Sequence, residues 1–146
     1  MLQRFEDFVT GIGVCYKYIQ RIKSLEMTEF GLKGTHVMCI YFLRRHPDGL
    51  TAAQLCQLCA EDKAAISRTL AVLQEKELIS VGEKKYRARL TLTENGEKLA
   101  SRIDELVGEW VGYGGDGLTD EERAMFYSTL SKIAANLKGR LQHPDN

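Results

Sequence analysis

With 146 residues, 44% of them hydrophobic, the chain is long enough for one domain and apolar enough to bury a core, which excludes an intrinsically disordered protein. Its 20 basic and 20 acidic side chains cancel, so binding to a nucleic acid would require a local basic patch. The start "MLQRFEDFVTGIGV" contains acidic residues, and no window reaches the roughly 18 uninterrupted apolar residues of a membrane helix, so we expect a soluble, cytoplasmic protein.

Helical spacing begins close to the N-terminus. Residues 2–24 place apolar side chains at intervals of four, three, four and three, which predicts a long helix with one apolar stripe. Gly11 and Gly13 are candidate bends in this helix. The stripe consists of Phe5, Val9, Ile12, Tyr16 and Ile19.

Three shorter helices follow along the chain. The first of these helices is predicted over residues 33–46 and ends at the turn sequence "HPDG". Thr51 is suited to cap a short helix over "AAQLCQLCA", and the stretch 62–79 predicts the third helix. Two helices joined by a tight turn are the outline of a helix-turn-helix.

The helix predicted over residues 62–79 has two different sides. Ile66, Leu70 and Leu73 fall at i, i+4 and i+7 and therefore face a core. The opposite side lacks the many long Lys and Glu side chains of a typical solvated helix. A slim side of this kind can approach base edges in a major groove, and arginine can pair bidentately with guanine; a merely solvated side is the alternative. The slim side consists of Ala64, Ser67, Arg68 and Ala71.

Residues 78–93 change from helical spacing to alternation. Apolar residues alternate with polar ones on both sides of "GEKK", which is a turn sequence, so a small β-hairpin is predicted. The alternating residues are Ile79 and Val81, then Tyr86, Ala88, Leu90 and Leu92.

The second strand of this hairpin gives it a basic outer side. If its apolar residues point inward, Arg87 and Arg89 point outward. Together with Lys84 and Lys85 at the tip, they place four cations within six residues. Residues 62–92 carry seven basic and four acidic side chains, a net charge of +3, so the basic patch lies here.

A linking helix is predicted over residues 101–111, with Ile103, Leu106 and Trp110 on its buried side. The glycine-rich stretch "GEWVGYGGDG" overlaps its end. No strand precedes this stretch and no Gly-Lys-Ser or Gly-Lys-Thr ends it, so a flexible joint is predicted and not a phosphate-binding loop.

The last helix starts where Thr119 and Glu122 stand at the spacing of a capping box. Its apolar residues repeat at intervals of four, three and four. The first and last helices would bury these stripes best against each other and against a second subunit, whereas an intramolecular pair covering the core is the alternative. The stripe of the last helix consists of Phe126, Leu130, Ile133 and Leu137.

A hairpin directly after the helix pair makes a winged helix. The stretches "GLTAAQLCQLCAEDKAAISRTLAVLQEKELI" and "YRARLTLTENGEKLA" resemble the multiple-antibiotic-resistance regulator (MarR) family of bacterial transcription factors, roughly over residues 30–105. The resemblance implies a mainly α fold with a small β-hairpin wing, in a single domain of residues 1–146. The winged helix-turn-helix would span residues 30–93, and dimerisation helices would lie in residues 1–29 and 94–146.

The resemblance also implies a function. Each subunit of a homodimer would place one helix in a major groove and the wing along the backbone into the adjacent minor groove. We therefore expect a sequence-specific transcriptional regulator, with a repressor as the preferred form, that binds a pseudo-palindromic double-stranded operator and responds to a small-molecule effector. The predicted DNA-binding residues are Thr51, Lys63, Ala64, Ser67, Arg68, Ala71, Lys84, Lys85, Arg87 and Arg89. The predicted dimerisation residues are Phe5, Val9, Ile12, Tyr16, Phe126, Leu130, Ile133 and Leu137.

Two alternative functions stay open. Organic-hydroperoxide sensors of this family carry a reactive cysteine on the first helix with tyrosines near it, and Cys15 resembles that cysteine because Tyr16 and Tyr18 follow it. A redox-sensing regulator is one alternative on this ground, although Cys15 also fits a buried inert thiol. A winged-helix protein adaptor without DNA binding is the other. No Gly-x-Ser-x-Gly, His-Glu-x-x-His or phosphate-loop motif is present, so no enzyme is predicted.

No metal or cofactor site is predicted. Four cysteines in a chain without a secretion signal are expected to be reduced thiols. Cys56 and Cys59 lie one turn apart in a helix whose Leu55 and Leu58 are expected to pack inward, and no second pair completes a zinc site. The histidines form no cluster in the sequence; they are His36, His46 and His143.

Overall fold

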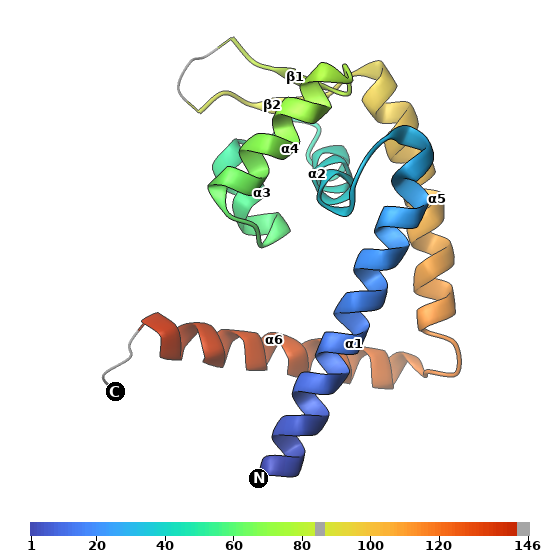
Figure 1. Cartoon of the computed structure of the whole chain (residues 1–146), viewed down its shortest axis with the longest axis vertical. Coiled ribbons are helices and arrows are strands. Elements are labelled where there is room, and N and C mark those ends of the chain that lie inside the picture. The colour runs from blue at the N-terminus through green and yellow to red at the C-terminus, as the bar shows by residue number, and fades with distance from the viewer. Residues whose placement is uncertain (84–86, 143–146) are drawn as a thin grey trace. The chain divides into compact units, whose positions relative to one another are not determined.

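In a computed structural model, the chain consists of helices and one two-stranded sheet (Figure 1). The structure describes residues 1–83 and 87–142. The elements in chain order are α1 (Leu2–Met27), the 3-10 helix η1 (Thr28–Phe30), α2 (Gly34–Arg45), α3 (Ala52–Cys59), α4 (Lys63–Glu75), β1 (Ile79–Val81), β2 (Leu90–Leu92), α5 (Glu94–Gly114) and α6 (Asp120–Gln142). This order confirms the predicted helical class with a hairpin wing. None of the described helices combines the length and the apolar character needed to cross a membrane.

The chain divides into two compact units, residues 1–106 and 107–146, which are described separately. In the first unit, α2, α3, α4 and the first part of α5 surround one apolar core. Each buried aliphatic side chain of this size stabilises the fold by about 1.5 to 3 kcal/mol relative to an exposed one. The fully buried aliphatic side chains of these helices are Ile40, Leu43, Leu55, Ile66, Leu73 and Ile103.

Side-chain caps set the positions at which α3 and α4 begin. The Thr51 hydroxyl accepts a hydrogen bond from the Gln54 N–H at 3.3 Å, and the Gln54 side chain accepts one from the Thr51 N–H at 2.9 Å. This confirms the predicted cap at Thr51. The Asp62 carboxylate accepts from the Ala65 N–H at 2.7 Å and caps α4 in the same way. Only two residues separate α3 from this second cap, so the turn between the helices is tight.

The fourth helix is shorter than the sequence pattern predicts. It ends at Glu75, because Glu77 adopts a left-handed backbone conformation with φ of 55°. The N–H of Leu78 then donates to the Leu73 carbonyl at 2.9 Å, which closes the helix end. Ile79 therefore starts β1 and does not belong to the helix.

The start of α2 uses a histidine as a helix cap. His36 is buried, and its Nδ1 accepts a hydrogen bond from the Lys33 N–H at 2.9 Å. Burial, together with the positive charges of Lys33 and Lys76, lowers the pKa of His36 from its ordinary value of 6.5. The neutral imidazole that this favours is the form that can accept at Nδ1. His46 is exposed, and His143 lies outside the described residues.

The two strands form an antiparallel hairpin whose base is attached to the turn between α2 and α3. Ile79 pairs with Leu92 and Val81 with Leu90. On the outer side of β2, Leu90 and Leu50 exchange two backbone hydrogen bonds, of 3.0 and 2.8 Å. Leu90 is buried, as predicted, whereas Leu92 and Ala88 are only partly so. Tyr86 lies outside the described residues.

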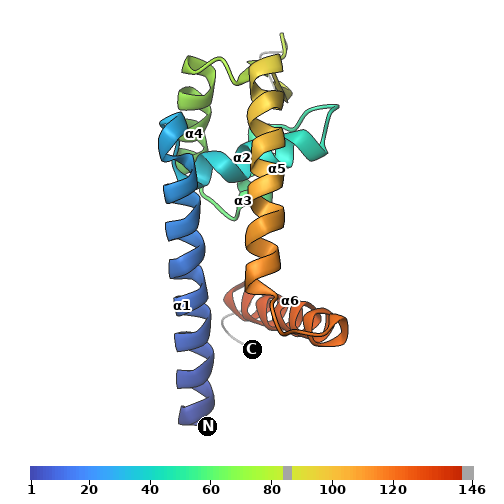
Figure 2. The ribbon, with the colours of Figure 1, turned by 90° about the vertical axis from the view of Figure 1, so that its right-hand side faces the viewer.

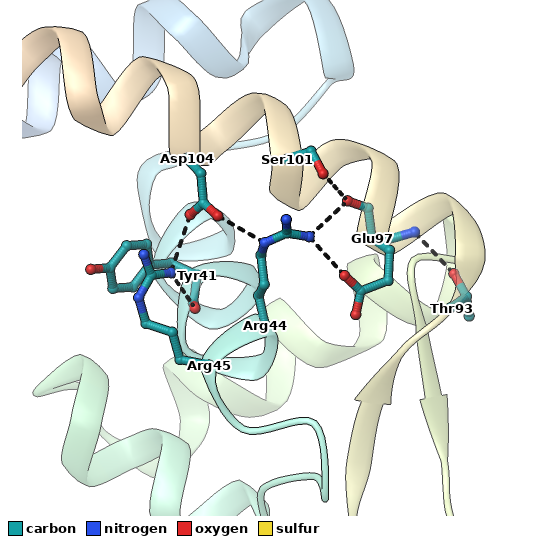
Figure 3. A network of polar contacts seen from close by, with 8 residues as sticks. Tyr41, Arg44, Arg45, Thr93, Glu97, Ser101 and Asp104 are labelled. Carbon is teal, nitrogen blue, oxygen red and sulfur yellow. Dashed lines mark hydrogen bonds and ion pairs between the residues drawn. The ribbon is translucent and has the colours of Figure 1, made fainter.

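A polar network joins α2 to α5 (Figure 3). The Arg44 guanidinium donates to Asp104 and to Glu97, both at 2.8 Å, and Arg45 reaches Asp104 at 3.2 Å. The Arg45 guanidinium also lies 3.5 Å from the centre of the Tyr41 ring. These side chains are partly exposed, so each ion pair contributes about 0 to 1 kcal/mol. The network fixes the direction in which α5 leaves the hairpin more than it stabilises the fold.

The first helix leaves the rest of its unit early. It runs unbroken through Gly11 and Gly13 and extends three residues beyond the predicted end at residue 24. In both ribbon views its N-terminal half stands clear of α2, α3 and α4 (Figures 1 and 2). Residues 1–19 are all exposed in the single chain, including the predicted stripe. The apolar stripe of α1 is therefore not covered by any described residue of this unit.

The second unit contains the end of α5 and the last helix, α6. The N–H of Thr119 donates to the Glu122 carboxylate at 2.8 Å, and the N–H of Glu122 donates to the Thr119 hydroxyl at 3.2 Å, which confirms the predicted capping box. The predicted glycine-rich joint is shorter than expected, because α5 continues to Gly114. Helical backbone tolerates exposed glycines at a cost of only about 1 kcal/mol each. Trp110, predicted to be buried, is 38% exposed and belongs to the second unit.

Two glycines of α5, Gly96 and Gly108, allow a matched test of how closely α5 packs against Leu78. A Cβ at Gly96 would collide with the backbone carbonyl of Leu78, whereas one at Gly108 would meet no described atom within 4 Å. We expect Gly96→Ala to lower the free energy of unfolding by about 1 to 3 kcal/mol, because backbone must move. Gly108→Ala should raise it by up to about 1 kcal/mol through helix propensity. Urea unfolding curves measure both, and equal midpoints would contradict the close approach of α5 to Leu78.

Candidate nucleic-acid interface

The helix α4 separates apolar and small residues onto opposite sides. Ile66, Leu70 and Leu73 are buried, which confirms the predicted core stripe. Thr69 is buried as well and was not predicted, because a polar residue does not belong to an apolar pattern. The slim side that the sequence indicates is exposed over its whole length, at Ala64, Ser67, Arg68 and Ala71.

The N-terminal end of α4 is also accessible. Lys63 is the first residue of the helix and is exposed next to the Asp62 cap. The backbone N–H groups of a first helical turn attract phosphate oxygens, and Lys63 adds a positive charge to them. The Asp62 cap, not predicted by name, is visible in the sequence as an aspartate directly before the helical spacing.

The side chain of Thr51 already has structural partners. It is half-buried, and its hydroxyl lies 3.1 Å from Gln54 Oε1 in addition to accepting from the Gln54 N–H. A contact of Thr51 with DNA would therefore be added to its capping role or would come from the first turn of α3. The predicted contact stays a prediction.

The four predicted cations of the wing differ in whether the structure describes them and in what their side chains contact. Lys84 and Lys85 lie outside the described residues. Arg87 is exposed and has a left-handed backbone with φ of 53°. The Arg89 guanidinium turns back toward the α2–α3 turn, where its Nη1 donates to the Gly49 carbonyl at 2.8 Å and to the Asp48 carbonyl at 3.3 Å. Arg89 thus supports the base of the wing in the free protein.

This supporting role had no local signal in the sequence. Arg89 and Gly49 are 40 residues apart, and alternation along a strand predicts only that Arg89 points away from the apolar side. Gly49 is suited to the contact because its φ of 85° is left-handed and a Cβ there would approach the Leu90 carbonyl to 2.9 Å. The hairpin and α4 lie at the same end of the unit in both views (Figures 1 and 2).

The predicted dimerisation residues are mostly accessible in the single chain. On α1, Phe5 is 65% exposed, and Val9, Ile12 and Tyr16 are also exposed. On α6, Phe126 and Leu137 are exposed, whereas Leu130 and Ile133 are partly covered. Cys15 is exposed on α1 in the single chain.

Comparison with known proteins places the winged helix in a family. A sequence model described as the MarR family matches residues 30–88, which run from η1 through α4 and β1 into the hairpin. Over residues 30–88 the chain matches the MarR family. The resemblance that the sequence motifs predict is thereby confirmed.

Solved structures resemble the chain beyond the segment that the family model matches. A MarR-family regulator from Silicibacter pomeroyi is 25% identical, with a TM-score of 0.75 and 86% of each chain covered. The transcriptional regulator SlyA is 20% identical, with a TM-score of 0.83 over 93% of this chain and 97% of that one. A putative MarR-family regulator from Listeria monocytogenes, solved in complex with a 26mer DNA, is 22% identical, with a TM-score of 0.81 over 88% and 87%. The flanking helices therefore belong to the shared fold.

The hydrogen bonds of Arg89 generate a prediction that does not involve DNA. Arg89→Met removes the donor to Gly49 but keeps the aliphatic stem, so we expect the free energy of unfolding to fall by about 0.5 to 1.5 kcal/mol. Arg89→Lys, which retains a cationic donor, should lose less. Thermal denaturation without DNA measures both variants. Unchanged stability of the Met variant would show that the wing base does not depend on this contact.

Proposed function

We propose that this MarR-family transcriptional regulator binds double-stranded DNA through the exposed side of α4, inserted in a major groove, with the wing along the adjacent backbone. The division of α4 carries this proposal. The buried side, through Ile66 and Leu73, fixes the helix on the core, and the exposed side offers small residues around Arg68. The shared fold with a regulator solved on DNA supports the same orientation.

A homodimer is the second part of the proposal. Apolar stripes as exposed as those of α1 and α6 are characteristic of association surfaces. A two-fold dimer would present two copies of α4 to half-sites about one helical turn, roughly 34 Å, apart, which fits a pseudo-palindromic operator. Repression follows in the simplest case, where the dimer occupies DNA that the transcription machinery needs. A cytoplasmic location is part of this proposal.

A small-molecule effector that changes the DNA affinity is the third part. An open pocket of about 560 Å³ lies between the end of α4 and the first half of α5. It combines apolar side chains, such as Phe30 and Leu99, with the cations Lys76, Lys98 and Arg102. A ligand there would contact the helix end next to the wing, so it could shift the equilibrium between binding-competent and incompetent arrangements. Cys15 remains an exposed candidate for a redox response.

The DNA-binding proposal is tested by titrating the protein onto the DNA upstream of its own gene and onto a scrambled duplex, at several salt concentrations. We expect a preference for the upstream DNA of about 10³-fold or more, and weaker binding to both duplexes as salt rises. A protein adaptor would show no preference for either duplex at any salt concentration, and that result would refute the proposal.

Arg68→Ala and Ile66→Ala separate the two sides of α4 in this assay. Arg68→Ala should weaken operator binding by about 1 to 3 kcal/mol and relax the preference at one base pair, with little change in stability. Ile66→Ala should lower the free energy of unfolding by about 2 to 5 kcal/mol before DNA is added. A melting curve and an operator titration on each variant provide the readout. An Arg68 variant that melts early but binds normally when folded would reverse the assignment of the two sides.

Val9→Asp and Thr10→Asp test the homodimer, because both residues are exposed on α1 and only Val9 belongs to the apolar stripe. Placing a carboxylate within an apolar interface should weaken dimerisation by about 2 kcal/mol or more. Thr10→Asp is the matched control and should stay dimeric. Sedimentation equilibrium measures the dimer dissociation constant of each protein. A monomeric unmodified protein at micromolar concentration would remove the dimer from the proposal.

A further inference from the structure

Two cysteines from different helices lie side by side in the helix-turn-helix. The Sγ atoms of Cys39 on α2 and Cys59 on α3 are 3.8 Å apart, although the residues are 20 positions apart in the chain. Cys39 is completely buried, whereas Cys59 is partly exposed. The two cysteines that are close in the sequence, Cys56 and Cys59, lie within one helix. The close pair in the structure joins two helices.

The packing of α3 explains why Cys59 reaches Cys39. Leu55, four residues earlier, is fully buried, and i and i+4 residues lie on one side of a helix. Leu58, which the sequence pattern places inside, is instead 40% exposed. Cys59 therefore follows Leu55 onto the side of α3 that faces α2.

The surroundings make the two thiols chemically unequal. A hydrogen bond from the Cys39 thiol lowers the pKa of Cys59, and the positive charge of Lys23 on α1 acts in the same direction, against burial and the charge of Glu61. The same hydrogen bond and burial raise the pKa of Cys39. Cys59 is thus the thiol that ionises first, and it is also the one that solvent reaches.

We propose that Cys59 and Cys39 form an oxidation site for hydroperoxides, in which Cys59 is the nucleophile, Cys39 resolves it, and the product is a disulfide that joins α2 to α3. The site differs from the family resemblance of Cys15, which lies on α1. Its consequence for DNA binding rests on the proposed function of α4.

The reaction balances in two steps. The Cys59 thiolate attacks one oxygen of the hydroperoxide, the O–O bond breaks, and the other oxygen leaves as an alcohol, or as water from hydrogen peroxide, after taking a proton. Cys59 is now a sulfenic acid. The Cys39 sulfur attacks the Cys59 sulfur, the S–S bond forms, and the hydroxyl group leaves as water with the Cys39 proton. The two thiols lose two electrons, which reduce the peroxide.

In the proposed oxidised state, closing the bond draws the Cys59 end of α3 toward α2. The sulfur atoms must approach from 3.8 Å to about 2.0 Å, a change of about 1.8 Å. Cys59 is the last residue of α3, and only Ala60 and Glu61 separate it from the Asp62 cap of α4. Ala60 is held in a left-handed conformation, and the Glu61 N–H donates to the Cys56 carbonyl at 3.1 Å, so this turn has little slack. A shift of Cys59 is therefore passed to the first turn of α4.

The oxidation site itself is tested without DNA. The full chain is treated with hydrogen peroxide, its remaining thiols are alkylated under acidic denaturing conditions, and the tryptic peptides are sequenced by mass spectrometry. We expect one intramolecular link between Cys39 and Cys59, with Cys15 and Cys56 alkylated. Cys56→Ser should retain this link, and Cys59→Ser should abolish it.

Three results of that experiment would overturn the site. They are a link between Cys39 and Cys56, oxidation confined to Cys15, and persistence of the link to Cys39 in the Cys59→Ser variant. Because the assignment comes from peptides of the unmodified chain, it does not depend on the variants being folded.

Cys39→Ala adds an independent check, since without the resolving thiol Cys59 should accumulate as a sulfenic acid that dimedone traps. Absence of dimedone labelling at Cys59 in that variant, with circular dichroism showing it folded, would contradict Cys59 as the nucleophile.

Titration of oxidised and reduced protein onto the upstream DNA tests the consequence for α4. We expect oxidation to weaken operator binding by about 5- to 150-fold, the effect of one lost bidentate base contact, and dithiothreitol to restore it. Cys56→Ser should respond like the unmodified chain, and Cys59→Ser should not respond. Equal affinity of the oxidised and reduced forms would refute the coupling to α4. If the reduced protein shows no operator preference, the proposed function fails, while the mapped disulfide still decides the oxidation site.

Discussion

The orientation of α4 about its own axis is the constraint on which the interface depends. Ile66 and Leu73 are fully buried two turns apart, so the helix cannot rotate without exposing at least one of them. Exposing one such side chain costs about 1.5 to 3 kcal/mol, a large fraction of the stability of a small domain. The slim side is held outward by the same burial. Short side chains can contact base edges only if the helix that carries them is held in one orientation about its axis.

Contacts at the two ends of α4 also help to hold this helix in its orientation. The Asp62 carboxylate fixes where the helix begins, and the left-handed Glu77 fixes where it ends. Thr93 donates to the Glu77 carbonyl at 2.7 Å and so joins that end to the start of α5. Arg44 then connects α5 back to α2. Each contact is individually weak, but together they connect α4 to α5 and α5 to α2.

Local patterns predicted those features of the fold that local physics determines. Apolar spacing located the helices, Thr51 and Thr119 located helix starts, and alternation located the hairpin, because each signal arises within a few residues of the feature it predicts. The same spacing misplaced Leu58 and Trp110, since an apolar residue at i+3 fits a helical stripe whether or not a neighbouring element covers it. The exposed side of α4 was predicted correctly because the sequence of that side is unusual in itself.

Contacts between distant parts of the chain could not be predicted in this way. The hydrogen bond from Arg89 to Gly49 and the proximity of Cys39 to Cys59 depend on how whole elements pack. The identity of an arginine or a cysteine in the sequence does not indicate which distant residue it will contact. The candidate site was therefore predicted as a set of exposed side chains, whereas the role of Arg89 within the free protein was not. A basic residue on a strand has the same sequence signature whether it contacts phosphate or a carbonyl group of its own chain.

The bridge between Leu50 and Leu90 also bears on how the protein avoids aggregation. A two-stranded sheet has two open edges, and an unpaired edge can recruit a strand from another molecule. Leu90 directs its N–H and carbonyl away from β1, and Leu50 occupies both groups. What remains uncovered on β2 is shorter than the strand itself, and β1 has only three residues. The turn after α2 thus protects the β2 edge of the sheet, and the β1 edge that remains is only three residues long, too short to be a good template for a strand of another molecule.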